Sequence, residues 1–547
     1  MMLSALMMMA ALSAAVPLPL AQDHPAAADT RPATLMPGIR GVHFAISTRR
    51  EDAQKFFDQG LALVYGFNHE EAVRSFRRAA EIDPASPMPY WGIALALGPN
   101  INQEIDAARE QASYDAVHRA MALAVRAPAK ERAYVAALAK RYSNDSGADL
   151  HSLAVEYKDA MRQLTRTYPS DMHAATLFAE SLMDLHPWAL YGADGAPAEG
   201  TSELVDVLEH VLEREPDHVG ANHYYIHATE ASLTPERGLK SAKKLEALVP
   251  AAGHLVHMPA HTYMRTGNYT GAVTANARAA EVDRKYIAET HADGFYPAMY
   301  YNHNLDFLAS AAMMAGQYAE ALAAAKELTA NVTPMLAEMP MLEPFGAKTL
   351  FVLIRFAKWN DVLALPRPSD RATLLAALYH FGRGVAHAAL GASSAADIDR
   401  QTFANAKQAV PPGTLFNLNP SATILDIAGH VLDARIAASQ DDTVAAIAAW
   451  QRAVEAEDTL AYNEPPDWFY PTRESLGAAL LRAKRYENAD LVFREDLERN
   501  PNNGRSLWGR WQTLRESDGD VPNTQVVRRR FQDAWNEADT ALRLEDF

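Results

Sequence analysis

The chain contains no cysteine, and this absence removes several kinds of chemistry. Disulfide bonds, thiolate nucleophiles, and zinc or iron–sulfur sites held by cysteine are all excluded. Basic residues are also scarce, because 51 Lys and Arg stand against 68 Asp and Glu and give a formal net charge of -17. Since no block rich in Lys or Arg occurs, nucleic acid is not expected as a partner. Phosphate loops, dinucleotide fingerprints and the G-x-S-x-G motif are missing as well.

Long apolar runs are missing beyond the N-terminus, which reads MMLSALMMMAALSAAVPLPLAQD. This run ends near Ala21 and is rich in small residues, and it resembles a secretory signal peptide that has no Lys or Arg at its start. We therefore expect residues 1–21 to be a signal peptide, residues 22–48 to be a flexible leader, and the protein to be periplasmic or secreted. No later run is long enough for a membrane span, so none is expected in the mature chain.

A repeated spacing of apolar and small residues dominates the rest of the sequence. In residues 53–86 the positions that carry it are Phe56, Gly60, Ala72, Phe76, Ala79 and Pro84. In residues 470–503 they are Gly477, Leu480, Tyr486, Ala489, Phe493 and Pro501. Pro216 and Pro250 lie one repeat length apart. These positions resemble the tetratricopeptide repeat (TPR) family, in which each unit is a pair of antiparallel helices, A and B.

The resemblance implies an all-α fold, a TPR-like α-solenoid with a right-handed superhelix. We expect an N-terminal TPR-like solenoid over residues 49–390, an insertion or linker over 391–420, and C-terminal TPR-like repeats over 421–547. Further insertions are expected near 186–200 and 284–300. No useful length of the sequence alternates between apolar and polar residues as a strand would.

Two short windows between residues 221 and 264 hold an unusual number of histidines, namely His223, His227, His254, His257 and His261. The first window, continued to Glu230, is spaced i, i+4, i+7, and the second is spaced i, i+3, i+7, so each forms one stripe along a helix. In the TPR register both stripes occupy positions of helix A that face the concave groove, on two neighbouring repeats. Pro259 lies inside the second window and is expected to kink its helix.

The same register places His303 and Asp306 on the next A helix and Glu180 on the preceding one. We predict metal ligands at His223, His227, His254, His257, His261, His303, Asp306 and Glu180. Imidazole and carboxylate without thiolate suit a transition metal ion, which could be copper, iron, zinc or manganese. The set exceeds what one tetrahedral ion needs, so it holds either two ions or one ion with outer partners. The motif HYYIH lacks the glutamate of the H-E-x-x-H metalloprotease fingerprint.

These residues favour a metal-dependent hydrolase or oxidoreductase that acts on a small-molecule or peptide substrate. In that interpretation Glu230 is the catalytic residue, because it could move protons beside the ion. The alternative is a non-enzymatic scaffold that binds a protein partner in its groove, and Lys, Arg and Asn along the groove would favour it. A third alternative is storage or delivery of metal. The segment EPPDWFYP, residues 464–471, is expected to cap the solenoid or cross its groove.

Overall fold

The computed structural model describes residues 33–517 and 521–547, so the predicted signal peptide and the start of the predicted leader lie outside the described residues. Within the described ranges nearly all regular structure is helical. One short antiparallel hairpin is present, formed by β1 (Leu415–Phe416) and β2 (Asn419–Pro420). Among the same residues, no helix has the length and apolar character needed to cross a membrane.

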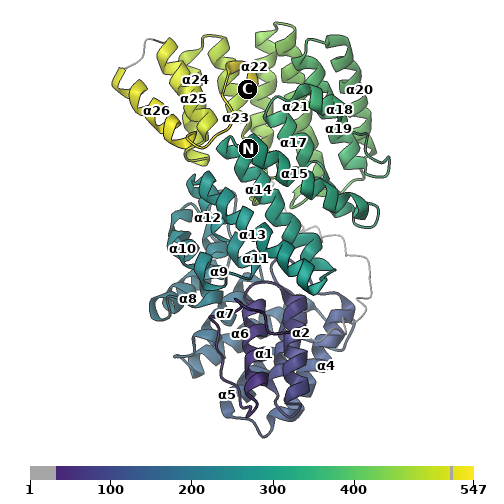
Figure 1. Ribbon diagram of the computed structural model, residues 1–547, viewed down its shortest axis with the longest axis vertical. Coiled ribbons are helices and arrows are strands. Elements are labelled where there is room, and N and C mark those ends of the chain that lie inside the picture. The colour runs from purple at the N-terminus through teal and green to yellow at the C-terminus, as the bar shows by residue number, and fades with distance from the viewer. Residues whose placement is uncertain (1–32, 518–520) are drawn as a thin grey trace, which may run out of the picture.

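The helices of the N-terminal part are α1 (Glu51–Val64), α2 (His69–Ile82), α3 (Met88–Leu97), α4 (Ala107–Ala124), α5 (Ala129–Leu138), α6 (Leu150–Thr167), α7 (Met172–Met183), α8 (Thr201–Arg214), α9 (Val219–Glu230), η1 (Pro235–Gly238), α10 (Leu239–Leu248), α11 (Gly253–His257), α12 (Pro259–Thr266) and α13 (Tyr269–Thr290). They occupy the lower and central part of the elongated molecule (Figure 1). Most are joined by short turns, so that successive helices pack against each other.

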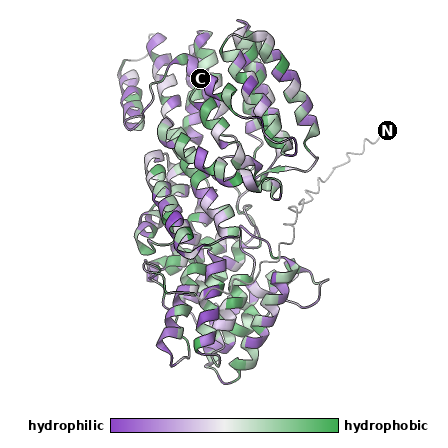
Figure 2. Cartoon of the chain, turned by 45° about the vertical axis from the view of Figure 1, so that its right-hand side comes forward, coloured by the Kyte–Doolittle hydropathy of each residue, from purple (hydrophilic) through white to green (hydrophobic). Residues whose placement is uncertain are grey.

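The remaining elements are η2 (Tyr296–Tyr301), α14 (Asn302–Ala315), α15 (Tyr318–Val332), η3 (Thr333–Met335), η4 (Pro340–Leu342), α16 (Glu343–Gly346), α17 (Lys348–Arg355), α18 (Trp359–Ala364), α19 (Thr373–Ala389), α20 (Ser393–Ala409), α21 (Ser421–Ser439), α22 (Thr443–Glu457), α23 (Thr472–Arg482), α24 (Tyr486–Arg499), α25 (Gly504–Glu516), α26 (Val521–Ala534) and η5 (Leu544–Asp546). The helices carry hydrophilic and hydrophobic residues together (Figure 2), as amphipathic helices that pack on neighbours do.

The repeat signature has a direct packing explanation. Phe76 of α2 lies against two glycines, where an added Cβ would stand 2.6 Å from its ring at Gly60 and 2.5 Å at Gly92. Phe493 of α24 lies in the same way between Gly477 and Gly509. A large ring on helix B thus fits where two successive A helices lack side chains, which lets the three helices approach closely. The predicted all-α, TPR-like solenoid is confirmed.

Seven turns between an A and a B helix share one backbone conformation. Each has a residue in the left-handed region two positions before helix B, with φ between 55° and 76°: Phe67, Gly267, Gly316, Ala357, Gly391, Asp441 and Lys484. The next residue donates its N–H to a carbonyl five residues back, as from Asn68 to Leu63 at 3.0 Å. This is the Schellman ending of a helix, and glycine is its preferred residue in the left-handed position.

Two expectations about segment boundaries need correction. The described part of the predicted flexible leader is packed, because Phe44 and Ile46 are buried and the Gln59 side chain donates to the Thr34 carbonyl at 3.0 Å. The predicted insertion over 391–420 holds α20, which packs antiparallel on α19 as a regular B helix, followed by the β1–β2 hairpin. Only the end of that segment departs from the repeat.

The N-terminal repeats curl so far that α2 touches the segment before α14. The Glu70 carboxylate accepts from the backbone N–H of Phe295 at 3.0 Å and of Tyr296 at 3.3 Å. The neighbouring Glu71 accepts from the Tyr286 hydroxyl at 3.2 Å. These contacts join residues more than 200 positions apart, and they enclose the concave face on which the histidines lie.

Candidate metal centre

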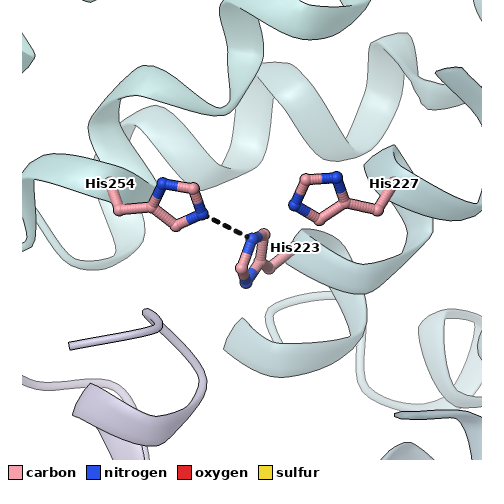
Figure 3. A group of neighbouring side chains, drawn as sticks. All are labelled: His223, His227 and His254. Atoms are coloured by element: carbon pink, nitrogen blue, oxygen red, sulfur yellow. Dashed lines mark hydrogen bonds between the residues drawn. The ribbon is translucent and has the colours of Figure 1, made fainter. Parts of the chain in front are cut away.

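Six of the predicted ligands converge on the enclosed concave face. They come from α9, from α11 and α12, and from α14, and they form two groups in which one nitrogen of each ring lies within 4.8 Å of the others. The first histidine group is His223, His227 and His254 (Figure 3). The second histidine group is His257, His261 and His303. All are buried except His303, which is half-buried.

A single stretch of chain, whose helix is broken once, contributes to both groups. Helix α11 ends at His257, and α12 begins at Pro259, whose ring cannot donate a backbone hydrogen bond. The break falls between the second and third histidines of the i, i+3, i+7 stripe. His254 and His257 of α11 lie in different groups, while His257 and His261, on the two sides of the break, bring their Nε2 atoms within 2.8 Å of each other in the second group.

Two rings are anchored through Nδ1 by acceptors that have no proton to give. His223 Nδ1 donates to the Tyr65 carbonyl at 2.6 Å, and His257 Nδ1 donates to Asn276 Oδ1 at 2.6 Å. The Asn276 amide is itself oriented, because its Nδ2 donates to the Ala272 carbonyl at 2.8 Å. Since the proton of each neutral ring must then be on Nδ1, Nε2 carries the lone pair. Metal-binding histidines are typically oriented in this way.

Glu230 anchors one ring in each group. One carboxylate oxygen accepts from His227 Nδ1 at 2.8 Å, and the other accepts from His261 Nδ1. Burial raises the pKa of the Glu230 carboxyl, but the adjacent His261 and His227 outweigh burial and hold that pKa below its ordinary value. Both oxygens are engaged by ring N–H groups. Glu230 is thus placed to orient two ligands, whereas the sequence predicted that it moves protons at a substrate.

The ring nitrogens in each group approach one another closely, and in the pair His257–His261 both rings are anchored through Nδ1. The Nε2 atoms of His257 and His261 are 2.8 Å apart, and those of His223 and His254 are 3.1 Å apart. Nitrogens that share one tetrahedral ion at roughly 2.0–2.1 Å would be about 3.3 Å apart. Burial, followed by the neighbouring imidazoles, lowers the pKa of His223, His254 and His257 well below the ordinary value, which disfavours a proton as the bridge.

Two buried nitrogens of the first group also lack a partner. Both His227 Nε2 and His254 Nδ1 are inaccessible to solvent and make no hydrogen bond. A buried polar atom without a partner is costly, so an unpaired atom in a native fold indicates that something else binds there. A cation held by His223, His227 and His254 would satisfy the Nε2 of His227 and separate the facing nitrogens.

The structure does not bring Glu180 or Asp306 into either group. Asp306 is paired with the Lys348 ammonium at 2.6 Å. Glu180 lies with Asp184 beside the Arg141 guanidinium, and burial, followed by Asp184, raises the pKa of Glu180 well above its ordinary value. Both carboxyls face the concave side, as their repeat positions predict, but neighbouring cations hold them away from the imidazoles.

A polar cluster outside the histidine groups is internally paired. His380, Arg383 and His387 all surround the Asp399 carboxylate, at 3.2, 3.5 and 2.9 Å. The segment 464–471 is largely buried between α22 and α23, where Phe469 stacks on Phe351 at 4.3 Å. It packs inside the solenoid and does not cap it.

Several residues around the groups could not be assigned from the sequence. The Tyr65 carbonyl is a backbone atom, and Asn276 lies on a B helix with no motif around it. Trp188, which packs 6.0 Å from the His227 ring, belongs to a segment predicted to be an insertion. Phe67 also contacts the first group. The sequence does carry a signal for it, because Phe67 occupies a turn position where the repeat prefers glycine.

Comparison with known proteins finds solved structures that align over most of the chain at low TM-scores. No family model matches the sequence, and no curated protein matches it. Among solved structures, the TPR domain of P58(IPK) is 12% identical, covering 85% of this chain and 98% of that chain with a TM-score of 0.21. The human IFIT1 dimer with m7Gppp-AAAA is 12% identical, covering 89% and 91% with a TM-score of 0.30. Yeast Tom70 is 10% identical, covering 88% and 90% with a TM-score of 0.28. The chemistry of the site rests on its own residues.

Proposed function

We propose that this chain binds two transition-metal ions, one in each histidine group. The observation that carries the proposal is the approach of Nε2 to Nε2 between His257 and His261, whose Nδ1 atoms are already engaged by Asn276 and Glu230. Four of the six rings are anchored through Nδ1 to an oxygen, which is the arrangement expected of metal ligands. Imidazole ligands without thiolate suit zinc, copper, iron or manganese.

We further propose that one of these ions supports hydrolysis or oxidation of a small molecule or peptide. A bound ion of this kind polarises a substrate or lowers the pKa of a bound water. His303 is the half-buried member of the six, so the second histidine group is the side from which a substrate has access. The N-terminal run of small apolar residues supports a periplasmic or secreted location for this activity.

Metal content tests the proposal directly. Protein purified without an affinity histidine tag and supplied with each of the four metals is expected to hold about two ions per chain, one for each set of three imidazoles. His223→Ala should remove one equivalent and His257→Ala the other, while the helical circular dichroism persists. His210→Ala, at an exposed histidine, is the matched control and should keep both. Folded protein that binds no metal after supplementation would refute the proposal.

A second function is favoured by the C-terminal repeats. Arg435, Arg482 and Arg505 lie on the successive A helices α21, α23 and α25, and each donates to a backbone carbonyl of the segment 544–547. A groove that holds a short segment, here the turn η5 and Phe547, through arginines has the lining that a peptide-binding scaffold requires. We propose that these repeats bind a peptide of the same acidic and aromatic character, LEDF.

A labelled peptide of residues 540–547 tests this groove. A variant with residues 544–547 replaced by glycine and serine is expected to bind it about ten-fold tighter or more than the wild type, because the chain's own segment no longer competes. Adding Arg482→Ala should weaken that binding, and a peptide of scrambled sequence should not bind. Fluorescence anisotropy measures all three. Equal anisotropy for the matching and scrambled peptides would contradict the proposal.

A further inference from the structure

Phe67 is an aromatic residue at a turn position where the repeat prefers glycine. It adopts φ 56° in the turn between α1 and α2, where three of the other six turns have glycine at the equivalent position. Bulky residues avoid this left-handed region because Cβ crowds the backbone. Ala357, Asp441 and Lys484 complete the set, so among these seven turns Phe67 is the aromatic residue at this position.

The strained turn delivers an aromatic ring to the first histidine group. The Phe67 ring is buried, and its centroid lies 4.6 Å from that of His223, 5.4 Å from that of His254 and 5.9 Å from that of His227. One side chain from the first repeat therefore contacts every ring of a group whose ligands come from α9 and α11. Strain held at such a position is typical of functional sites.

The second histidine group has a counterpart on a regular helix. Phe307 of α14 is fully buried, with its ring centroid 4.7 Å from that of His261, 4.8 Å from that of His257 and 5.5 Å from that of His303. Each group of three imidazoles is thus covered by one phenylalanine. The difference is in the backbone, since Phe307 is held by a helix and Phe67 by a turn.

We propose that Phe67 and Phe307 are the lids of the two metal sites, and that each controls the exchange of the ion beneath it. An apolar ring packed on three ligands keeps water and competing ligands from the ion, and this shell governs access to a metal site. Phe67 can swing with its turn, whereas moving Phe307 requires α14 to shift. This inference rests on the proposed binding of two ions.

Chelator extraction from the fully loaded chain tests the lids. Phe67→Gly, which suits the turn backbone, is expected to release one equivalent about ten-fold faster or more and to leave the other unchanged. Phe307→Leu should accelerate the other equivalent alone. Lys484→Gly makes the same backbone change far from the histidines and should alter neither rate. With Co²⁺ as the bound ion, Phe67→Gly should also change the visible absorption of one site as water enters.

The outcomes separate the lid from the metal site itself. A wild-type chain that takes up no metal refutes the proposed function and the lids together. Two bound ions with equal extraction rates in wild type and Phe67→Gly refute the lid of the first site alone. Phe67→Leu keeps an apolar side chain and serves if the glycine variant does not fold. Phe67→Leu is expected to accelerate the extraction of the same ion by a smaller factor. If both the extraction rate and the Co²⁺ spectrum of this variant equal those of the wild type, Phe67 is not a lid.

Discussion

Replacing Glu230 by glutamine is expected to weaken metal binding in both histidine groups, by about 10–100-fold in the more affected one. The carboxylate accepts from His227 in one group and from His261 in the other. Glutamine has one oxygen and one amide N–H₂ group, so one ring N–H meets another donor. That ring must then change its tautomer, and its Nε2 loses the lone pair that binds the ion. Both rings also lose the negative charge that increases their basicity.

Competition with a chelator of known affinity measures the two binding constants. Asn276→Leu is the matched comparison, because Asn276 anchors His257 only and the substitution should weaken the second histidine group alone. The two binding constants measured for each variant distinguish a carboxylate that orients ligands of both ions from a residue that serves one ion only. If Glu230→Gln leaves either group at its wild-type affinity, Glu230 does not couple the two sites.

Glu474→Gln is expected to destabilise the C-terminal repeats by about 3–5 kcal/mol, since it leaves buried charges without a partner. Glu474 is fully buried and receives the guanidinium groups of Arg355 and of Arg505, the latter at 3.0 Å. Burial raises the pKa of Glu474, but the two arginines outweigh it and hold the pKa low, so the group is a carboxylate. For Arg505, burial followed by Arg355 lowers the pKa to about 9 despite Glu474.

Hydrogen exchange measured by peptide locates the effect. Protection across α23 and α25 should fall in Glu474→Gln, while protection across the histidine-bearing helices α9 and α11 stays at its wild-type level. Glu487→Gln, at an exposed position in the first turn of α24, removes the same charge from the surface and should change protection little. Equal protection in the two variants would show that the buried arginines do not depend on Glu474.

Most of what could be predicted from the sequence, namely the fold and the positions of the histidines, followed from the repeat register. Gly60 and Phe76 fix how an A and a B helix pack together. The two residues are close in the sequence, so their spacing can be recognised from the sequence alone. The same register brings His223 and His254 to one face, although the histidines lie on different helices. Spacing gives the direction of a side chain from its helix, and that was enough to predict the six converging imidazoles.

The pairing of charged groups could not be predicted in this way. Glu180 and Asp306 have the concave positions expected of them, but Arg141 and Lys348 reach them from other helices. Long basic side chains can approach from several directions, and a repeat position does not specify which carboxylate they meet. Helix α20 was not predicted because its buried aromatic residue, Phe403, does not stand at the B-helix position that Phe76 occupies in α2 and Phe493 in α24.

The contacts of Glu70 and Glu71 have a consequence for how this chain unfolds. In an ordinary solenoid each unit touches only its neighbours, so the array melts like a linear chain of coupled segments. Here the hydrogen bonds from Tyr286 and Tyr296 to α2 join the start of the N-terminal repeats to their end. That part of the chain is a closed ring, and its units share one cooperative transition. The C-terminal repeats close back in a similar way, because the Asp539 carboxylate accepts from the backbone N–H of Tyr318 at 2.7 Å and of Ala319 at 2.8 Å, so they too are expected to unfold together.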